Sequence, residues 1–226
     1  MATGLATPLL HDEHDPTVIL GTNGPDLIVT GGGPQSILGG NGDDTILAGG
    51  GPDTIHCANG SDRAEGGGGP DLLAGGNGKD ELLGGAGPDA LVGGNGRDVL
   101  TGGLAADVLT GGRGADVFVY MARQDAAAHG EEGGHDGGEI DHEEASVESI
   151  TDFQPGLDHI DLSALGVVQG FSDDLAAYAV WAVQQGEDAV LMIDLDGDIM
   201  GDHPAEMSIH LLGVDAAALG GSDFIL

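Results

Sequence analysis

Eleven copies of one nine-residue unit run without interruption from Gly21 to Val119 in this chain of 226 residues. The unit reads G-G-x-G-x-D-x-U-x, where U is a large apolar residue. A short unit repeated in register is typical of a solenoid, in which each copy buries its apolar side chain against the copies on either side. The repeat therefore predicts an elongated all-β fold over residues 21–119.

The sixth position of the unit is acidic in every copy but the second. Its residues, always nine apart, are Asp26, Gln35, Asp44, Asp53, Asp62, Asp71, Asp80, Asp89, Asp98, Asp107 and Asp116. Calcium takes about six to eight oxygen ligands, and backbone carbonyls serve it as well as carboxylates do. Glycine turns allow carbonyls to converge beside such a carboxylate. The unit therefore predicts calcium ions held by these Asp side chains and by glycine carbonyls.

The glycines expected to supply carbonyl ligands occupy the second and fourth positions of repeats three, four and six to nine. They are Gly40, Gly42, Gly49, Gly51, Gly67, Gly69, Gly76, Gly78, Gly85, Gly87, Gly94 and Gly96. The fifth repeat departs from the pattern, with Cys57 and Ala58 in place of its first two glycines and Ala64 in place of its large apolar residue. The tenth repeat has Ala105 where the fourth-position glycine belongs. We expect poorer packing around the fifth repeat.

A second period lies within the first, because odd and even repeats differ. The third position of the first five odd repeats is Asn23, Asn41, Asn59, Asn77 and Asn95, and the fifth position of the first four even repeats is Pro34, Pro52, Pro70 and Pro88. Two different turns and two strands then form one coil of eighteen residues. The alternation predicts a parallel β-roll in which each type of turn stacks along its own edge.

The repeats resemble the RTX calcium-binding nonapeptide family. That resemblance implies that each ion lies between a turn and the next turn on the same edge, with ligands from repeats n and n+2. The odd edge then has five intervals between Asp residues and the even edge three, since uncharged Gln35 should leave its interval with Asp53 weak or empty. We expect about eight calcium ions, and a roll that folds only when calcium neutralises its carboxylates.

The nine-residue period stops after Val119. Residues 150–153 (I-T-D-F) and 156–163 (G-L-D-H-I-D-L-S) resemble the segment that follows the roll in serralysin-type proteases. That resemblance implies a C-terminal β-sandwich-like cap over residues 120–226, interrupted by an acidic insertion at 125–148. Residues 1–20 are expected to form an acidic N-terminal tail. Residues 176–185 are expected to form a short helix or a strand, with Trp181 in the core.

The charge of the chain excludes several kinds of partner. Its 39 acidic residues face only five basic ones, for a formal net charge of −34. Such a surface repels nucleic acid and anionic membranes. No stretch is long and apolar enough to insert into a membrane. Cys57 is the single cysteine, so an intramolecular disulfide is impossible.

The two ends of the chain bear on localisation. Residues 1–10 lack the basic residues and the apolar run of a general secretory signal. The last four residues, Asp223-Phe-Ile-Leu226, resemble the end of the type I secretion signal of RTX exoproteins. That resemblance implies a secreted, extracellular protein, with a type I transporter as a transient partner that passes the chain out unfolded.

No enzymatic activity is expected. The zinc motif H-E-x-x-H of serralysins is absent, and His11-Asp-Glu-His14 has the wrong spacing. Two interpretations of His129, His135 and His142 remain open: a zinc or nickel site, or a solvated loop that binds no metal. The segment that begins with residues 194–198 (D-L-D-G-D) does not match an EF-hand, because glycine and glutamate are missing at the required spacing. A separate calcium site of another kind in this segment remains open.

Three functions remain open. The first is that the chain is a secreted calcium-binding RTX protein whose roll folds on extracellular calcium after type I export. Alternatively, it is the C-terminal part of a larger serralysin-like exoprotease. The third possibility is a calcium-dependent adhesin or extracellular matrix protein with an unknown surface or glycan partner, or a module for a polysaccharide-modifying enzyme.

Overall fold

The computed structural model describes residues 18–121, 148–166, 168, 170–171, 179–194 and 207–226. Twelve strands cover the repeats: β1 (Val18–Leu20), β2 (Leu27–Val29), β3 (Ser36–Asn41), β4 (Thr45–Gly50), β5 (Thr54–Asn59), β6 (Arg63–Gly68), β7 (Leu72–Gly78), β8 (Glu81–Ala86), β9 (Ala90–Gly96), β10 (Val99–Leu104), β11 (Val108–Arg113) and β12 (Val117–Val119). The full-length strands begin at the seventh position of one repeat and reach the third position of the next, or the fourth in β7 and β9. The residues from there to the sixth position form the turn.

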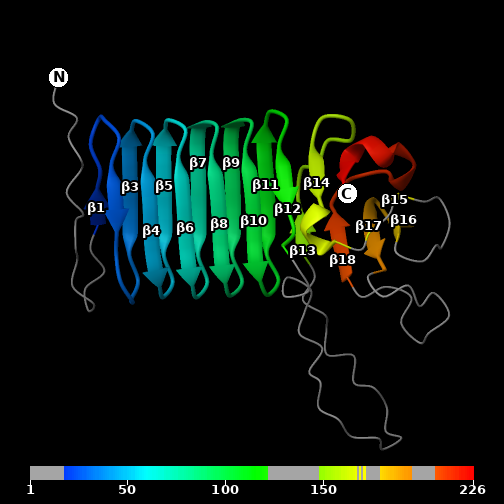
Figure 1. The fold of residues 1–226 in the computed structure, drawn as a ribbon, viewed down its shortest axis with the longest axis horizontal. Coiled ribbons are helices and arrows are strands. Elements are labelled where there is room, and N and C mark those ends of the chain that lie inside the picture. Colours follow the sequence, from blue (N-terminus) through cyan, green and yellow to red (C-terminus); the bar gives the residue numbers. More distant parts are fainter. Residues whose placement is uncertain (1–17, 122–147, 167, 169, 172–178, 195–206) are drawn as a thin grey trace, which may run out of the picture.

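These strands alternate between two parallel sheets, so that odd-numbered strands pair with one another and even-numbered strands do the same. Ser36 of β3 pairs with Thr54 of β5, and Thr45 of β4 pairs with Arg63 of β6. Both registers advance by one coil of eighteen residues. The fold is therefore the expected all-β parallel β-roll, drawn end to end in Figure 1. Residues 18–20, placed in the N-terminal tail by the sequence, form β1 and pair with β3.

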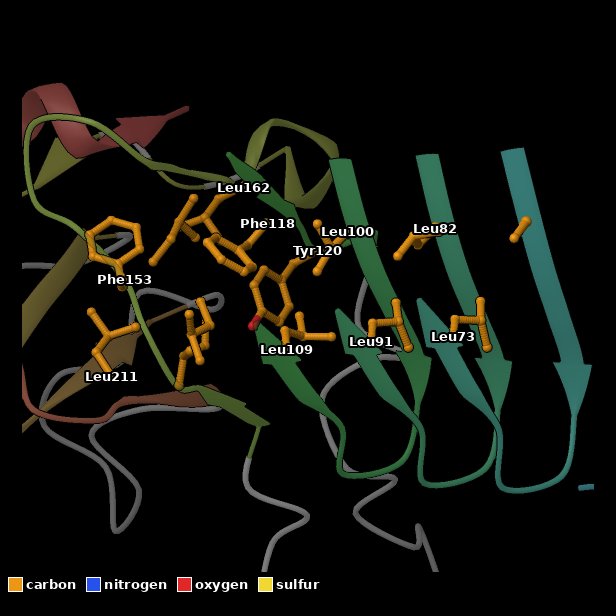
Figure 2. Packing of buried hydrophobic residues seen from close by; sticks show 14 of the residues in the cluster. Leu73, Leu82, Leu91, Leu100, Leu109, Phe118, Tyr120, Phe153, Leu162 and Leu211 are labelled. Carbon is orange, nitrogen blue, oxygen red and sulfur yellow. The ribbon is translucent and has the colours of Figure 1, made fainter. Parts of the chain in front are cut away.

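The core between the sheets is a column of eighth-position side chains. These residues are at most 1% exposed: Ile28, Ile37, Ile46, Ile55, Ala64, Leu73, Leu82, Leu91, Leu100, Leu109 and Phe118. Figure 2 shows the leucines of successive strands stacked in this column, with Phe118 and Phe153 at its C-terminal end. Burying one such side chain stabilises a fold by roughly 1.5–3 kcal/mol. Because the core is only one side chain wide, much of the stability of the fold must come from interactions in the turns.

The third-position asparagines form a ladder along the odd edge. Each side-chain amide donates to the asparagine one coil earlier, from Asn41 to Asn23 at 2.7 Å and from Asn95 to Asn77 at 2.8 Å. The intervening bonds join Asn59 to Asn41 and Asn77 to Asn59 at 2.9 Å. This ladder holds the odd turns in register without a metal ion.

The C-terminal strands continue the two sheets of the roll. They are β13 (Glu148–Ile150), β14 (His159–Asp161), β15 (Gly170–Phe171), β16 (Ala179–Gln185), β17 (Asp188–Ile193), β18 (Met207–Leu211) and β19 (Phe224–Ile225), with short 3-10 helices at Ser163–Leu165, Ala216–Ala218 and Gly221–Asp223. β13 pairs in parallel with β11, and β14 with β12. The predicted β-sandwich-like cap over residues 120–226 is not confirmed and stays a prediction. The described segments contain no helix with the length and apolar character needed to cross a membrane.

Residues 179–185 form a strand, which settles the choice between helix and strand for this part of the chain. Trp181 lies in the core as expected, since it is 7% exposed. β16 and β17 form an antiparallel pair, and β17 pairs with β18 in the same way. Antiparallel pairing ends the parallel stack on that sheet. Phe171 and Phe224 pack face to face, with ring centroids 5.0 Å apart.

Two alanines in the repeats adopt backbone angles that favour glycine. Ala58 has a φ of 81° and Ala105 a φ of 90°. A side chain in this region costs about 1–2 kcal/mol. The backbone at Ala58 and Ala105 thus keeps the conformation that glycine has in the other repeats, and each alanine is strained there.

Ala105→Gly is expected to stabilise the folded chain by about 0.5–1 kcal/mol, because relief of the strain exceeds the added entropy of the unfolded chain. The measurement is urea unfolding at saturating calcium. Ala106→Gly is the control, since the φ of Ala106 is outside the left-handed region and glycine there should only destabilise. Equal effects of the two substitutions would contradict the explanation.

Candidate metal centre

The sixth-position Asp residues stack along the two edges of the roll. Each carboxylate reaches back one coil, where its Oδ1 accepts a hydrogen bond from the backbone N–H of the residue eighteen positions earlier. Asp44 accepts from Asp26 at 2.8 Å, and Asp116 accepts from Asp98 at 2.9 Å. The same bond joins all intervening pairs at 2.7–2.9 Å. Repeats n and n+2 are therefore in contact, as the sequence predicted.

The second carboxylate oxygen, Oδ2, is buried along both edges. It has no hydrogen-bond partner among the described residues in Asp44, Asp53, Asp62, Asp71, Asp80, Asp89, Asp98 and Asp116. These residues are at most 4% exposed. In the described part of the chain, the basic side chain that forms ion pairs is Arg63, with Glu65 and Glu81, and both pairs are on the surface. A buried carboxylate with no counter-charge is costly, so these oxygens point to a cation.

The first-position glycines show where such a cation finds a second oxygen. A Cβ placed on Gly93 would lie 2.6 Å from Asp98 Oδ2 and 2.6 Å from the carbonyl oxygen of Gly111, one coil later. The same pair of oxygens surrounds Gly75 and Gly84. In these turns Oδ2 thus faces the next turn on its edge. First-position carbonyls were absent from the predicted ligands, although the glycine that opens most repeats was a signal for them.

The predicted second- and fourth-position glycines all have positive φ, from 101° at Gly49 to 155° at Gly96. A Cβ on any of them would collide with the backbone of the equivalent residue in the preceding coil. Glycine there is required by this close approach. Metal binding by their carbonyls stays a prediction.

The oxygen donor set of the turns suits calcium better than it suits softer metals. Across the described residues, no three His, Cys, Asp or Glu side chains come together to hold a metal ion. A cation between two turns would therefore be held by Asp carboxylates and backbone carbonyls. Oxygen-only sites of this kind suit calcium, whereas zinc prefers nitrogen and sulfur ligands.

Comparisons with known proteins agree with this geometry. The family model for the RTX calcium-binding nonapeptide repeat matches residues 20–55, 58–91 and 83–118. The AlgE6R3 subunit of the Azotobacter vinelandii mannuronan C5-epimerase is 30% identical, with a TM-score of 0.51, over 70% of this chain and 78% of that subunit. The chain belongs to the RTX calcium-binding repeat family.

Two further solved structures are similar to this RTX chain at lower identity. The extracellular lipase LipA of Serratia marcescens is 16% identical with a TM-score of 0.42, over 97% of this chain and 42% of the lipase. The AlgE6R2 subunit of the Azotobacter epimerase is 24% identical with a TM-score of 0.34, over 94% and 93% of the two chains. No curated protein sequence matches the chain. The family match ends at residue 118, so the serralysin-type character of the C-terminal half stays a prediction.

Burial changes the protonation of the RTX carboxylates. Loss of hydration raises the pKa of Asp53, Asp80 and Asp98 to about 6, and that of Asp89 to about 7. The backbone hydrogen bond to each carboxylate opposes this effect, and neighbouring carboxylates on the same edge add to it. Burial also raises the pKa of Asp44, Asp62, Asp71 and Asp116. Protons and cations therefore compete for the same oxygens.

In a calcium chelator, the RTX roll is expected to gain β-structure as the pH falls from about 7.5 to about 5. The folded pKa values lie above the ordinary value of 3.8, so the folded state binds more protons than the unfolded state between roughly pH 4 and 7. Stability then falls as pH rises through that window. Circular dichroism measures the effect, and Asp89→Asn should weaken it. A roll that gained stability with rising pH would contradict this account.

The N-terminal turn of each edge differs from the interior turns. The Thr30 hydroxyl shares its single proton between Gln35 Oε1, at 3.1 Å, and the Ala48 carbonyl. Asp26 Oδ2 accepts from the N–H of Thr22 at 2.6 Å. Gln35 Oε1 and Asp26 Oδ2 therefore have partners within the protein, in contrast to Oδ2 of the eight interior Asp residues named above.

Gln35→Asp is expected to add one calcium ion to the even edge, because it places a charged carboxylate in the interval that ends at Asp53. Oxygen ligands of higher charge raise calcium affinity. Calcium bound per chain at saturation measures the effect, with Gln35→Glu as the control for charge at a longer reach. An unchanged number of ions in Gln35→Asp would contradict the pairing of repeats n and n+2.

Two acidic residues outside the repeats were missed by the sequence analysis. Asp158 Oδ1 accepts from the N–H of Asp116 at 3.0 Å, so Asp158 continues the odd edge. Ser149 pairs with Val108. Glu148, one residue before Ser149, therefore occupies the position next to Asp107 on the even edge. The stretch Gly156-Leu-Asp-His-Ile160 retains G-x-D-x-U, which was the available signal.

Several predicted features lie outside the described residues. They include His11, His14, His129, His135, His142 and residues 195–198 of the EF-hand-like segment. Asp194, the first residue of that segment, is buried. Cys57 is also buried, and loss of hydration raises the pKa of its thiol, which favours the unreactive neutral form.

Proposed function

We propose that this chain is a secreted calcium-binding protein whose roll folds on extracellular calcium after type I export. The observation that carries the proposal is the double row of buried Asp carboxylates, eight of which have an Oδ2 without a hydrogen-bond partner among the described residues. When bound, calcium would supply positive charge and cross-link consecutive turns through Asp and glycine carbonyl oxygens. The chain's own residues hold the turns in register and exclude water from the carboxylates.

The expected energies are large enough for a folding switch. Calcium at ten times its dissociation constant adds about 1.4 kcal/mol per independent site. About eight ions would then add roughly 11 kcal/mol, compared with a total stability of about 5–15 kcal/mol for an ordinary domain. Without calcium, the rows of carboxylates repel one another and the narrow core must offset that repulsion alone. We infer that calcium decides whether the roll folds.

The C-terminus supports the same proposal. Phe224 is buried in β19, which pairs with β14. Asp223 accepts hydrogen bonds from the N–H groups of Gly156 at 2.7 Å and Gly220 at 2.8 Å. Two of the four residues that resemble an export signal, Asp223 and Phe224, are therefore built into the folded protein, and a transporter would reach these two freely only in the unfolded chain. Export before calcium binding satisfies this requirement.

The test is far-ultraviolet circular dichroism during a calcium titration from chelator, with magnesium as the control. We expect a cooperative gain of β-structure at about 0.1–1 mM calcium, the range of extracellular calcium modules. Magnesium should not replace calcium, because it holds its water ligands more tightly. A roll fully folded in chelator at neutral pH would refute the folding switch.

A second candidate function, binding of an acidic polysaccharide, is favoured by a row of bases on the odd edge. Lys79 and Arg97 follow the paired residues Gly78 and Gly96 in neighbouring turns, and Arg113 pairs with Asn95. All three side chains are exposed. The similar Azotobacter subunit comes from an enzyme that acts on mannuronan. Under this proposal the chain binds such a polymer in calcium and catalyses no reaction itself.

Co-sedimentation with polymannuronate in calcium and in chelator tests this candidate. Replacement of Lys79, Arg97 and Arg113 by Ala should abolish binding, whereas Arg63→Ala, on the outer face of a sheet, should retain it. Binding that is unaffected by the triple substitution would exclude the basic row.

A further inference from the structure

The outer faces of the two sheets of the roll differ in charge. On the sheet of even-numbered strands, Arg63, Glu65 and Glu81 occupy outward positions and form surface ion pairs. On the sheet of odd-numbered strands, the seventh- and ninth-position residues of β3, β5, β7, β9 and β11 form what we call the neutral face. These residues include no Asp, Glu, Lys or Arg, although the chain has a net charge of −34.

The neutral face is apolar and open to solvent. Four of its side chains are 38–45% exposed: Leu38, Leu72, Val92 and Val108. A groove of about 400 Å³ runs between this face and the row of turn prolines, and Leu72, Ala90 and Val108 line it. Single exposed aliphatic side chains are ordinary, but a continuous apolar patch on a soluble protein marks an interaction surface.

The side chains at the centre of the neutral face match one another in size under a two-fold rotation. Leu72 of β7 pairs with Ala90 of β9, and Ala74 pairs with Val92. Consider a two-fold axis that runs parallel to the strands, between β7 and β9, in the plane where two such faces meet. It places Leu72 of one copy opposite Ala90 of the other, beside the groove, and Val92 opposite Ala74. Large side chains then meet small ones at all four central positions, as a self-complementary interface requires.

We propose that the neutral face is a docking surface for a second copy of this chain. Two sheets packed face to face bury both apolar surfaces and bring no two acidic side chains into contact there. This inference goes beyond the proposed function, because it requires only the folded roll.

The size of the neutral face sets the strength of the pair. From β1 to β13 the sheet spans six strand spacings, or about 29 Å, and the outward residues of one strand cover about 10 Å. The contact is then about 300 Å² per copy, less than half of the roughly 800 Å² of a stable interface. We therefore expect a weak dimer, with a dissociation constant of about 0.1–1 mM.

Sedimentation velocity of the full chain in saturating calcium tests the dimer, at protein concentrations from about 10 μM to about 1 mM. The sedimentation coefficient of the wild type should rise over this range. Leu72→Lys should weaken association about tenfold or more, because it buries an unpaired charge opposite Ala90 of the second copy. Leu83→Lys is the matched control, since Leu83 lies on the outer face of the other sheet, where it pairs with Glu65. It should associate as the wild type does.

A mixture of two variants tests the position of the axis. Ala90→Glu alone should also weaken association, because the new carboxylate faces Leu72 of the second copy. Mixed with Leu72→Lys, it should restore association, since the introduced lysine and glutamate face each other in the mixed pair. Arg63 and Glu81 occupy the same position of other repeats, so both substitutions are compatible with the fold, which circular dichroism checks.

The outcomes separate the dimer from the calcium switch. A wild type that stays monomeric at about 1 mM would overturn the dimer, and so would a Leu72→Lys variant that associates as the wild type does. A mixture that stays monomeric would refute the two-fold arrangement. A chain already folded in chelator would refute the calcium switch and leave the dimer intact.

Discussion

Gly78→Ala is expected to prevent the roll from folding at calcium concentrations that fold the wild type. Gly78 has a φ of 140°, and a Cβ there would overlap the carbonyl oxygen of Gly60 and lie 2.6 Å from its carbon. Gly60 cannot move away easily, because its N–H donates to the Asn77 carbonyl at 2.9 Å. The combined strain and collision should cost roughly 3 kcal/mol or more. The calcium midpoint by circular dichroism and urea unfolding at saturating calcium measure the loss.

Gly68→Ala is the matched control for this prediction. Gly68 occupies the third position of its repeat, where the eighth repeat has Ala86, and a Cβ there meets nothing within 4 Å. The substitution should change stability by no more than about 0.5 kcal/mol. If the two variants were equally stable, the fourth-position glycines could not lie as close to the backbone of the preceding coil as the structure places them.

Asp80→Asn is expected to have opposite consequences with and without calcium. Asn retains the Oδ1 that accepts the Asp62 N–H at 2.9 Å, and it replaces the unpartnered Oδ2 with a neutral amide. In chelator, the variant should have as much β-structure as the wild type or more, because a buried charge is gone. In calcium, it should bind fewer ions and lose about 1.4 kcal/mol or more at ten times the dissociation constant. Adding Asp98→Asn should increase the loss.

Asp43→Asn controls for the change in net charge. Asp43 lies in the same edge, is exposed, and accepts the Ser61 N–H through Oδ1 at 2.8 Å. It should bind the wild-type number of ions and fold at nearly the wild-type calcium concentration. Equal shifts for Asp43→Asn and Asp80→Asn would assign the effect to overall charge and remove the argument for bound ions.

The repeats could be interpreted from sequence because their contacts are periodic. A spacing of nine placed each Asp, and the alternation of asparagine and proline separated the two edges, as the strand pairing confirms. The eighth-position side chains were assigned to the core for the same reason. When the repeat spacing is fixed, the residue that pairs with a given strand residue can be predicted by counting along the sequence. The strand pairing of an ordinary sheet cannot be predicted in this way.

The C-terminal continuation could not be obtained in this way. Asp158 lies 42 residues after Asp116, and Ser149 pairs with Val108 across a comparable separation, so no fixed spacing marks either contact. The register there depends on which strands find each other in space. Resemblance predicted a β-sandwich-like cap that continues the roll, but it did not indicate that β13 and β14 pair directly with the last strands of the repeats. The first-position carbonyls were missed because every glycine of a turn looks alike in sequence.

The alternation of the two edges also limits how the length of such a protein can change. Deleting a single nonapeptide would shift every later asparagine turn onto the proline edge, and would break the side-chain ladder that joins Asn41, Asn59 and Asn77. Deleting eighteen residues would remove one coil and leave each remaining turn beside its own kind. Lengthening and shortening by duplication or loss are therefore tolerated in pairs of repeats, and a rod of this design grows by whole coils.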